Sequence, residues 1–301
     1  MKIVNCSDPH IRYQAPRCRT DNYFETMLRK LSWVVSKVEE KAVLVLPGDI
    51  FDSHKAPDIL KYKFIEIFKK IAGRVLVVPG QHDQRFHTQG IENIPLGIPI
   101  VCDIAVLLRE NPIYFLDEYG EATYFYGAPW GTEIPDITTP DEFNVLVIHA
   151  MISDKDYWAS NLEFTDAKEL LEAYDFDLIL SGDNHKPFVI KSGRKTLING
   201  GSLMRSSIDQ MDHEPSIMIF DTHTRKYEKL YIPIEPAEDV MKIEDYEKEK
   251  EKNENLELFI KSLPEFLHSR KDLNYVGVLE KLLKEVDDTE IDELIWEAIG
   301  E

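Results

Sequence analysis

Short apolar runs alternate with longer amphipathic stretches in the first 80 residues. Three of these runs are brief and almost continuously apolar, which predicts buried β-strands at residues 2–6, 43–47 and 74–79. Residues 22–40 and 57–72 place apolar side chains on one face at helical spacing, with Asp21 as the expected N-cap of the first helix. Strands and helices that alternate over short connections predict parallel βαβ units, whose ligands bind at the carboxyl ends of the strands.

From about residue 99 the apolar runs become shorter and lie closer together. They predict further strands at residues 104–108, 113–116, 122–126, 143–148, 176–180, 188–191, 195–198, 216–221 and 226–232, with a helix near 165–174. Pro233 and Pro236 mark a boundary, beyond which the chain is rich in Glu and Lys. We therefore expect an α/β domain over residues 1–235 and a small acidic helical region over residues 236–301, with its last helices at 276–286 and 290–299.

The composition suits a soluble protein with a sizeable core, since 43% of the 301 residues are hydrophobic. No run of about 18 apolar residues occurs, so no membrane span is expected. The chain enters its first strand without a signal peptide, and Cys6, Cys18 and Cys102 are too widely spaced for a disulfide framework or a zinc knot. These features predict a cytoplasmic protein.

The formal net charge of −20 lowers the expectation of a nucleic-acid partner. However, the charge is unevenly distributed, because residues 235–301 hold 21 acidic and 9 basic residues. The remaining part of the chain therefore carries less than half of the net charge. Bound metal ions would neutralise some of its carboxylates, so the charge does not exclude DNA as a substrate.

Polar side chains with metal-binding chemistry follow five of the predicted strands. They are Asp8 and His10, Asp49, Gln81 and His82, His149, and Asp183 with His185. One such pair alone is more often an ordinary turn, but five strand ends of the same kind are hard to explain by packing. Mixed carboxylates and imidazoles suit Mn²⁺, with Mg²⁺, Fe²⁺ or Zn²⁺ as alternatives. A pair of ions about 3.5–4 Å apart that shares one carboxylate could clamp both oxygens of a displacement at phosphorus.

Two other histidines, His213 and His223, do not follow a predicted strand in this way. We predict that both are surface residues outside the site.

The five clusters resemble the five sequence blocks of the calcineurin-like metallophosphoesterases in type and order. They read Asp-Pro-His at 8–10, Gly-Asp-Ile-Phe-Asp at 48–52, Gly-Gln-His-Asp at 80–83, Val-Ile-His-Ala at 147–150 and Gly-Asp-Asn-His at 182–185. Within that family, the second block and the segment at 201–210 resemble the Mre-eleven/SbcD branch of DNA repair nucleases, which includes phage versions. The resemblance covers about residues 1–235 and implies a four-layer αββα sandwich.

The resemblance also implies a role for each polar residue. Asp8, His10, Asp49 and His185 would hold the first metal ion, and Asp49, Gln81, His149 and Asp183 would hold the second, with Asp49 as the bridge. His82 would protonate the leaving oxygen, while Asp52 and Asp83 would orient the ligands.

Two residues depart from the family pattern, and both belong to the second metal position. Gln81 stands where the family has asparagine, and Asp183 stands where it has histidine. A carboxylate in place of an imidazole makes the position harder and more anionic, which favours Mn²⁺ or Mg²⁺ over Zn²⁺. A poorly occupied second position with weakened activity is the alternative. The longer amide and the shorter carboxylate could also compensate for each other.

The branch resemblance implies a Mn²⁺-dependent DNA nuclease, acting as an exonuclease on duplex ends and as an endonuclease on single strands. It would work as a homodimer in DNA repair and recombination, together with an SMC-like ATPase of the SbcC type. The helices after Asp21 and Pro57 would form the dimer face, and the last helices would dock the ATPase. Candidate DNA contacts are Arg12, Arg17, Arg19 and Arg205.

Two other functions stay open at this point. One is a small-molecule or cyclic-nucleotide phosphodiesterase or phosphatase, and the other is a metal-deficient scaffold that binds DNA. The polarity of cleavage, the identity of the ATPase and a cellular or phage origin do not follow from the sequence.

Overall fold

The computed structural model describes residues 1–84, 90–154 and 164–242. By its internal contacts the chain divides into one unit from Met1 to Ile243 and a second from Glu244 to Glu301. The helices predicted at 276–286 and 290–299 lie outside the described residues.

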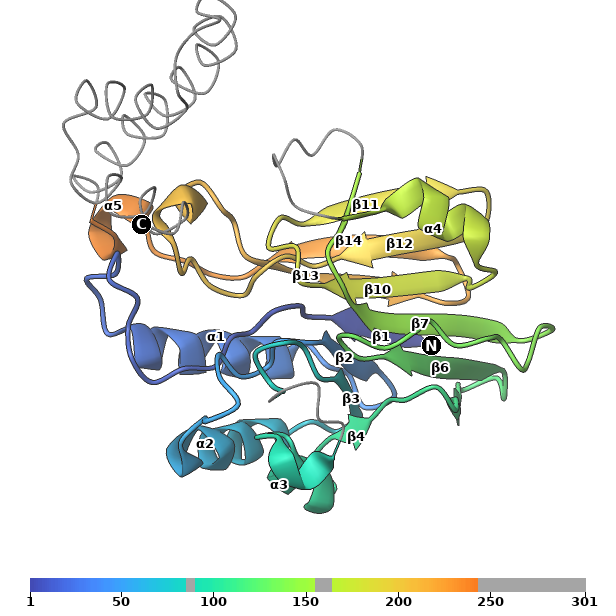
Figure 1. Cartoon of the computed structure of the whole chain (residues 1–301), viewed down its shortest axis with the longest axis horizontal. Coiled ribbons are helices and arrows are strands. Elements are labelled where there is room, and N and C mark those ends of the chain that lie inside the picture. The colour runs from blue at the N-terminus through green and yellow to red at the C-terminus, as the bar shows by residue number, and fades with distance from the viewer. Residues whose placement is uncertain (85–89, 155–163, 243–301) are drawn as a thin grey trace, which may run out of the picture. The chain divides into compact units, whose positions relative to one another are not determined.

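Two six-stranded sheets form the centre of the first unit (Figure 1). The first has the order β14-β13-β1-β2-β3-β4, and the second has the order β11-β12-β10-β7-β6-β5. The strands of the first sheet are β1 (Lys2–Asn5), β2 (Val43–Pro47), β3 (Arg74–Val78), β4 (Val106–Leu107), β13 (Ser216–Asp221) and β14 (Lys226–Tyr231). Those of the second are β5 (Ile113–Leu116), β6 (Ala122–Ala128), β7 (Phe143–His149), β10 (Leu178–Gly182), β11 (Phe188–Ser192) and β12 (Lys195–Asn199). The short strands β8 (Ile152–Ser153) and β9 (Thr165–Asp166) pair separately.

Helices cover the two outer faces of the stacked sheets. On the first sheet lie α1 (Tyr23–Ser36), α2 (Asp58–Phe68) and α3 (Gly97–Val101), while α4 (Ala167–Ala173) lies on the second (Figure 1). In β2, Leu44 packs with the residues of α1 and α2, whereas Val45 packs with Val145 and Val147 of β7 in the core between the sheets. This alternation follows from the period of two along a strand. The four-layer αββα sandwich is thereby confirmed.

The helix boundaries differ from those predicted. Helix α1 ends at Ser36 and α2 ends at Phe68, because the residues that follow are mostly polar and exposed. The N-cap of α1 is Asn22, not Asp21, whose carboxylate instead accepts hydrogen bonds from Arg19 and Thr26. Helix α3 and the 3₁₀ turns η1 (Ile91–Asn93) and η2 (Ile208–Gln210) were not predicted, since so few residues show no periodicity. Helix α5 (Ala237–Val240) follows Pro236 directly.

Cys6, Cys18 and Cys102 form no disulfide within the described part of the chain. Among the described residues, no helix combines the length and the apolar character that a membrane crossing requires. The pairing of β1 with β2 and of β2 with β3 is parallel, as is that of β7 with β10. The carboxyl ends of these strands therefore reach the same edge of the sandwich, where the polar clusters follow them.

Candidate active site

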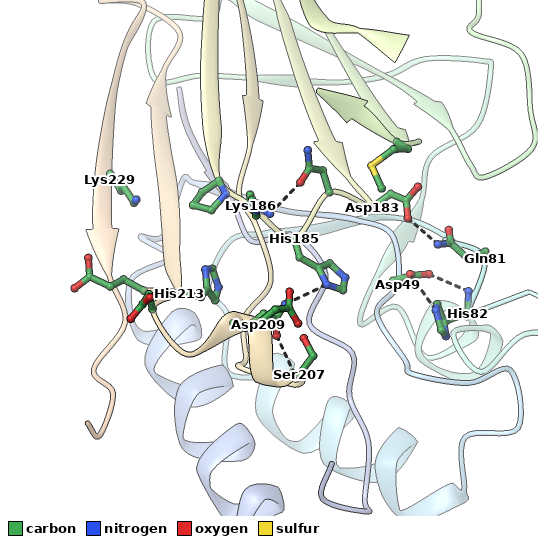
Figure 2. A pocket seen from close by; sticks show the side chains of 16 residues that line it. Asp49, Gln81, His82, Asp183, His185, Lys186, Ser207, Asp209, His213 and Lys229 are labelled. Atoms are coloured by element: carbon green, nitrogen blue, oxygen red, sulfur yellow. Dashed lines mark hydrogen bonds and ion pairs between the residues drawn. The ribbon is translucent and has the colours of Figure 1, made fainter. Parts of the chain in front are cut away.

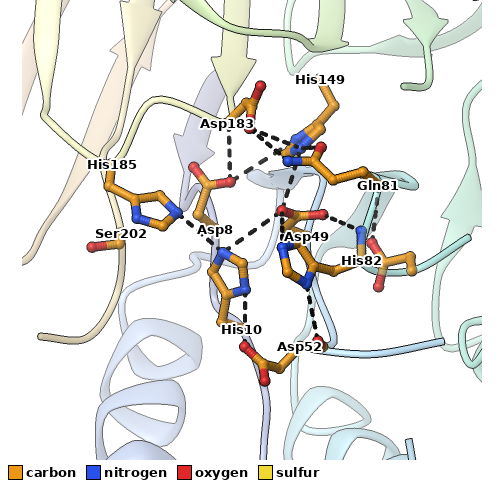
Figure 3. Close-up of polar contacts among 12 residues, drawn as sticks. Asp8, His10, Asp49, Asp52, Gln81, His82, His149, Asp183, His185 and Ser202 are labelled. Carbon is orange, nitrogen blue, oxygen red and sulfur yellow. Dashed lines mark hydrogen bonds and ion pairs between the residues drawn. The ribbon is translucent and has the colours of Figure 1, made fainter. Parts of the chain in front are cut away.

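The predicted ligands from both sheets meet in one polar cluster at this edge (Figure 3). His10 Nε2 lies 3.1 Å from His185 Nε2 and 3.7 Å from Asp49 Oδ2. His149 Nε2 lies 3.5 Å from the same Asp49 oxygen, and His149 Nδ1 lies 3.9 Å from Asp8 Oδ1. Asp49 is thus at the centre of the cluster, between groups from the first and the second sheet.

The backbone at four of these residues is in the left-handed region. Asp8 has φ 45°, His10 has φ 43°, Asp49 has φ 44° and Asp183 has φ 89°. Such conformations cost about 1–3 kcal/mol for residues other than glycine, and they cluster at functional sites. They turn the side chains away from the direction of each strand and into the cluster.

Glycines allow the strand ends to approach closely. A Cβ atom on Gly48 would lie 2.0 Å from His149 Nδ1, and one on Gly80 would lie 2.1 Å from Asp49 Oδ1. Both distances are far below van der Waals contact, so any side chain at either position would displace a ligand. The glycine that begins each of these sequence blocks is therefore required by packing around the site.

Gln81 joins two other predicted ligands of the second metal position. Its amide oxygen lies 2.7 Å from His149 Nε2, and its amide nitrogen donates to Asp183 Oδ1 at 2.7 Å. The other ring nitrogen of His149 lies 2.8 Å from the carbonyl oxygen of Pro47, so both nitrogens face acceptors and both carry protons. Burial by itself lowers the pKa of His149, but Asp49 and Asp8 outweigh it and raise the pKa to about 9.

The donor set fits divalent metal ions. Asp8 Oδ2 is buried and has no hydrogen-bond partner among the described residues, which suits an atom that would face a cation. Candidate ligand atoms lie within 4.8 Å of one another in the groups Asp8, His10 and His185, and Asp8, Asp49 and His149. A third group of this kind combines His10 and His82 with Asp52. Asp183 belongs to no such group within the part of the chain that the structure describes, although its Oδ1 lies 3.9 Å from His149 Nε2.

Without a bound cation, the pKa values of the buried acids Asp8 and Asp49 are shifted in opposite directions. Burial raises the pKa of Asp8 to about 7, although the charge of His149 opposes this rise. Burial also acts to raise the pKa of Asp49, but hydrogen bonding and charge from His149 outweigh it, and the pKa falls to about 2. Burial lowers the pKa of His185 to about 4. A bound divalent ion would stabilise the ionised carboxylates and the neutral imidazoles that ligation requires.

Asp83 and Asp52 hold the loops and rings of the cluster. The buried carboxylate of Asp83 accepts backbone N–H groups from Ile50, Phe51 and Gly80, which ties together the loops after β2 and β3. Asp52 Oδ1 lies 3.4 Å from His10 Nδ1, and Asp52 Oδ2 pairs with Arg12 at 3.2 Å. Their contacts are those of residues that orient other groups.

His82 lies at the mouth of the cluster, with 45% of its side chain exposed. Its backbone N–H donates to Asp49 Oδ1 at 2.9 Å, and its ring Nδ1 lies 3.0 Å from the carbonyl oxygen of Asp52. Because a carbonyl can only accept, Nδ1 carries a proton. The other ring nitrogen, Nε2, lies 3.8 Å from Asp49 Oδ2.

Two of the four predicted DNA contacts are buried. The guanidinium of Arg19 binds Asp21 and the carbonyl oxygen of Arg205, and that of Arg205 binds the carbonyl oxygens of His213 and Glu235. Lys30 lies beside them, and burial lowers its pKa to about 7. These cations fix the segment after β12, so the prediction that Arg19 and Arg205 contact DNA is contradicted by their burial. Arg12 is paired with Asp52, and Arg17 is exposed.

A cavity of about 610 Å³ opens beside the cluster (Figure 2). Its lining includes Asp49, His82 and His185 at one end, with Asp209, Asp212, Glu214, His213, Lys186 and Lys229 elsewhere. The prediction that His213 is a surface residue was wrong, because its Nε2 lies 2.7 Å from the carbonyl oxygen of Ser202 and the ring is half-buried. His223 is exposed, as expected.

Sequence reasoning also assigned no role to Ser202 and Gln210, which contact each other and, through Gln210, His185. The resemblance at residues 201–210 was the available signal for them.

The chain belongs to the calcineurin-like phosphoesterase family, whose model matches residues 1–187. This is a family of metal-dependent phosphoester hydrolases. All the predicted ligands, from Asp8 to His185, lie within the matched region. No curated protein matches the chain.

Several solved structures are similar to the chain at low identity. An archaeal phosphodiesterase is 11% identical with a TM-score of 0.43, and the match covers 77% of this chain and 100% of that one. Zinc-bound Vps29 from Entamoeba histolytica is 13% identical with a TM-score of 0.37, covering 77% and 99%. A 5′-nucleotidase precursor from Thermus thermophilus is 11% identical with a TM-score of 0.44, covering 88% and 59%. The family assignment depends on the family match, not on these overlays.

Proposed function

We propose that the chain is a DNA nuclease that hydrolyses phosphodiesters with two divalent metal ions, Mn²⁺ in preference to Mg²⁺. The observation that carries the proposal is the convergence of His10, His82 and His149 on Asp49, together with the buried oxygen Asp8 Oδ2, which no described residue pairs with. When bound, a pair of divalent ions would supply Lewis-acid charge to both oxygens of a displacement at phosphorus.

The residues of the chain have separate tasks in this reaction. Asp8, His10, Asp49 and His185 would hold the first ion, and Asp49, Gln81, His149 and Asp183 would hold the second. His82, whose Nδ1 faces the carbonyl oxygen of Asp52, would give a proton from Nε2 to the leaving oxygen. Its position at the exposed mouth of the cluster suits contact with a substrate that arrives from solvent.

We propose further that the chain acts as a homodimer beside an SMC-like ATPase of the SbcC type. The dimer face would be formed by α1 and α2, and the exposed apolar side chains of Ile59 and Tyr62 on α2 support it. Residues 236–301 would dock the ATPase, and the complex would act in DNA repair and recombination in the cytoplasm. Arg12 and Arg17, in the loop after β1, remain the candidate contacts to a phosphate backbone.

A small phosphodiester is the second candidate substrate, and the cavity favours it. Its volume of about 610 Å³ is within the range of small-molecule sites. Asp209, Asp212 and Glu214 on its wall would repel the phosphate backbone of a long polyanion.

Incubation of the protein with Mn²⁺ separates the substrates. We expect cleavage of end-labelled duplex DNA and of circular single-stranded DNA, and little turnover of a cyclic nucleotide or of bis(p-nitrophenyl) phosphate. Turnover of the small diesters alone would establish the second candidate. Turnover of neither substrate would contradict both candidates and would favour the metal-deficient scaffold.

Asp183 should determine the metal preference of the second position. Replacement by histidine restores an imidazole ligand and is expected to raise the affinity for Zn²⁺ relative to Mn²⁺ by about tenfold or more. Histidine, aspartate and asparagine all tolerate the left-handed backbone at this position better than most residues do. Metal content after dialysis against equal Zn²⁺ and Mn²⁺ is the measurement.

The matched control is Asp183→Asn, which removes the charge and keeps an oxygen that can accept from Gln81. This variant should bind the second ion more weakly without gaining a preference for Zn²⁺. An unchanged preference in Asp183→His would contradict a role for Asp183 at the metal.

A further inference from the structure

Gln210 contacts His185, one of the predicted metal ligands, from a segment to which no role has been assigned. It is the last residue of the 3₁₀ turn η2, and its side chain is buried beside His185. The turn has a capping box in which the side chains of Ser207 and Gln210 each bind the backbone at the opposite end. One side of the Gln210 amide therefore bonds to the backbone of its own turn, and the other side faces His185.

The orientation of this amide follows from its backbone partners. The N–H groups of Ser206 and Ser207 point to Gln210 Oε1 at 2.6 and 3.3 Å. A backbone N–H can only donate, so the atom that it faces must be the oxygen of the amide. The amide nitrogen consequently faces His185 Nδ1 at 3.2 Å and Ser202 Oγ at 3.3 Å.

This orientation assigns the proton of His185. An amide nitrogen is only a donor, so His185 Nδ1 must accept, and the ring carries its proton on Nε2. That nitrogen lies 3.1 Å from His10 Nε2, with the two rings nearly perpendicular (Figure 3). His10 Nε2 must then accept, which places the proton of His10 on Nδ1, facing Asp52 Oδ1 at 3.4 Å. The hydrogen bonds from Ser206 through Gln210 and His185 to His10 thus all run in one direction.

The donor-to-acceptor direction of these hydrogen bonds opposes ligation of a metal ion by His185. A histidine that ligates through Nε2 carries its proton on Nδ1 and normally donates it to a carboxylate, a carbonyl or a water molecule. In this chain Nδ1 faces an N–H group, so a proton on Nδ1 would meet another donor. A rotation of the Gln210 amide by 180° would leave the N–H groups of Ser206 and Ser207 without an acceptor.

We propose that Gln210 is a positioning residue that holds His185 in its Nε2–H tautomer and thereby lowers the affinity of the cluster for the first metal ion. The proposal rests on the proposed function in that it takes His185 as a ligand of that ion. Metal binding would require the proton to move from Nε2 to Nδ1 and the Gln210 amide to give up its present contacts. Gln210 therefore regulates how readily the site is loaded.

The tautomer can be measured directly on the metal-free protein with ¹⁵N-labelled histidine. Long-range ¹H–¹⁵N correlation spectra distinguish Nε2–H from Nδ1–H, and the loss of one ring pattern in His185→Gln assigns the signal. We expect the Nε2–H pattern for His185 in the unsubstituted protein. An Nδ1–H pattern there would overturn the proposal without need of any Gln210 variant.

Gln210→Glu tests the consequence for metal binding. One carboxylate oxygen can keep the N–H groups of Ser206 and Ser207, while the other accepts a proton on His185 Nδ1 and leaves Nε2 free. We expect the tautomer to change to Nδ1–H and the Mn²⁺ affinity of the first ion, measured by calorimetry, to rise by about tenfold or more. Unchanged affinity in a folded variant would overturn the proposal.

Met211→Glu is the charge control, because it adds the same negative charge one residue along the segment. It should keep the affinity of the unsubstituted protein, and an equal rise would attribute the effect to charge and overturn the proposal. Both measurements are made without substrate, so a lack of nuclease activity would leave their results intact. Failure of the proposed function and failure of this inference are therefore distinguishable.

Discussion

Replacement of Asp49 by asparagine is expected to lower the turnover of a phosphodiester substrate by about three orders of magnitude, since the loss of about 4 kcal/mol of transition-state stabilisation corresponds to that factor. Asp49 is the carboxylate to which His10, His82 and His149 all point, and it would bridge the two ions. Asparagine has nearly the same shape but no charge. It also tolerates the left-handed backbone at this position, so the loop is expected to keep its conformation.

Turnover should be measured with saturating Mn²⁺, and the metal content of the purified variant should be determined in parallel. We expect fewer than two ions per chain in the variant. The matched control is Asp58→Asn on α2, whose carboxylate is almost fully exposed and lies outside the cluster. Activity near that of the unsubstituted protein in Asp49→Asn would contradict the bridging role.

Replacement of His82 by alanine is expected to lower turnover by about 10²- to 10⁴-fold on substrates with a poor leaving group, such as DNA. The reason is the loss of the proton that Nε2 would give to the leaving oxygen. A nitrophenolate leaves without protonation, so the slow turnover of bis(p-nitrophenyl) phosphate should fall much less. Metal content should stay unchanged, because no ligand has been removed.

The contrast between the two leaving groups is the decisive measurement. A purely structural histidine would lower both rates equally, since its removal would disturb the loop that carries Gln81 and Asp83. His223→Ala is the matched control, because His223 is exposed and pairs with Asp117 outside the cluster. Equal losses on both substrates would contradict the role of His82 as a proton donor.

The sequence predicted the sheet strands well and the helix ends less well. Strands β2, β3 and β7 were predicted within a residue or two because each is a continuous apolar run that ends at a glycine, a proline or a histidine. The last turn of α1 was placed too far along the chain, since the apolar spacing continues to Val38 while the helix stops at Ser36. Local pattern gives the type of an element more reliably than its ends.

The polar strand ends were sufficient to propose the metal-binding residues from the sequence alone. Asp8, Asp49 and His149 are far apart in sequence, but each lies at the end of a strand that pairs in parallel with a neighbour, and parallel strands end at one edge. The same local reasoning failed for the arginines. Arg19 and Arg205 look like exposed cations in sequence, yet long-range packing beside α1 buries them and directs them to backbone carbonyls.

By itself, the sequence determined the layered α/β fold and the residues that could bind metal, because strand periodicity and the five polar blocks are local features. The tertiary structure alone decided that Gln81 joins His149 to Asp183, that His213 and Gln210 border the site, and that Arg19 and Arg205 are buried. It also decided which nitrogen of His185 carries the proton. These outcomes depend on which donors and acceptors meet across distant segments, and the spacing of residues along the chain does not encode the direction of a hydrogen bond.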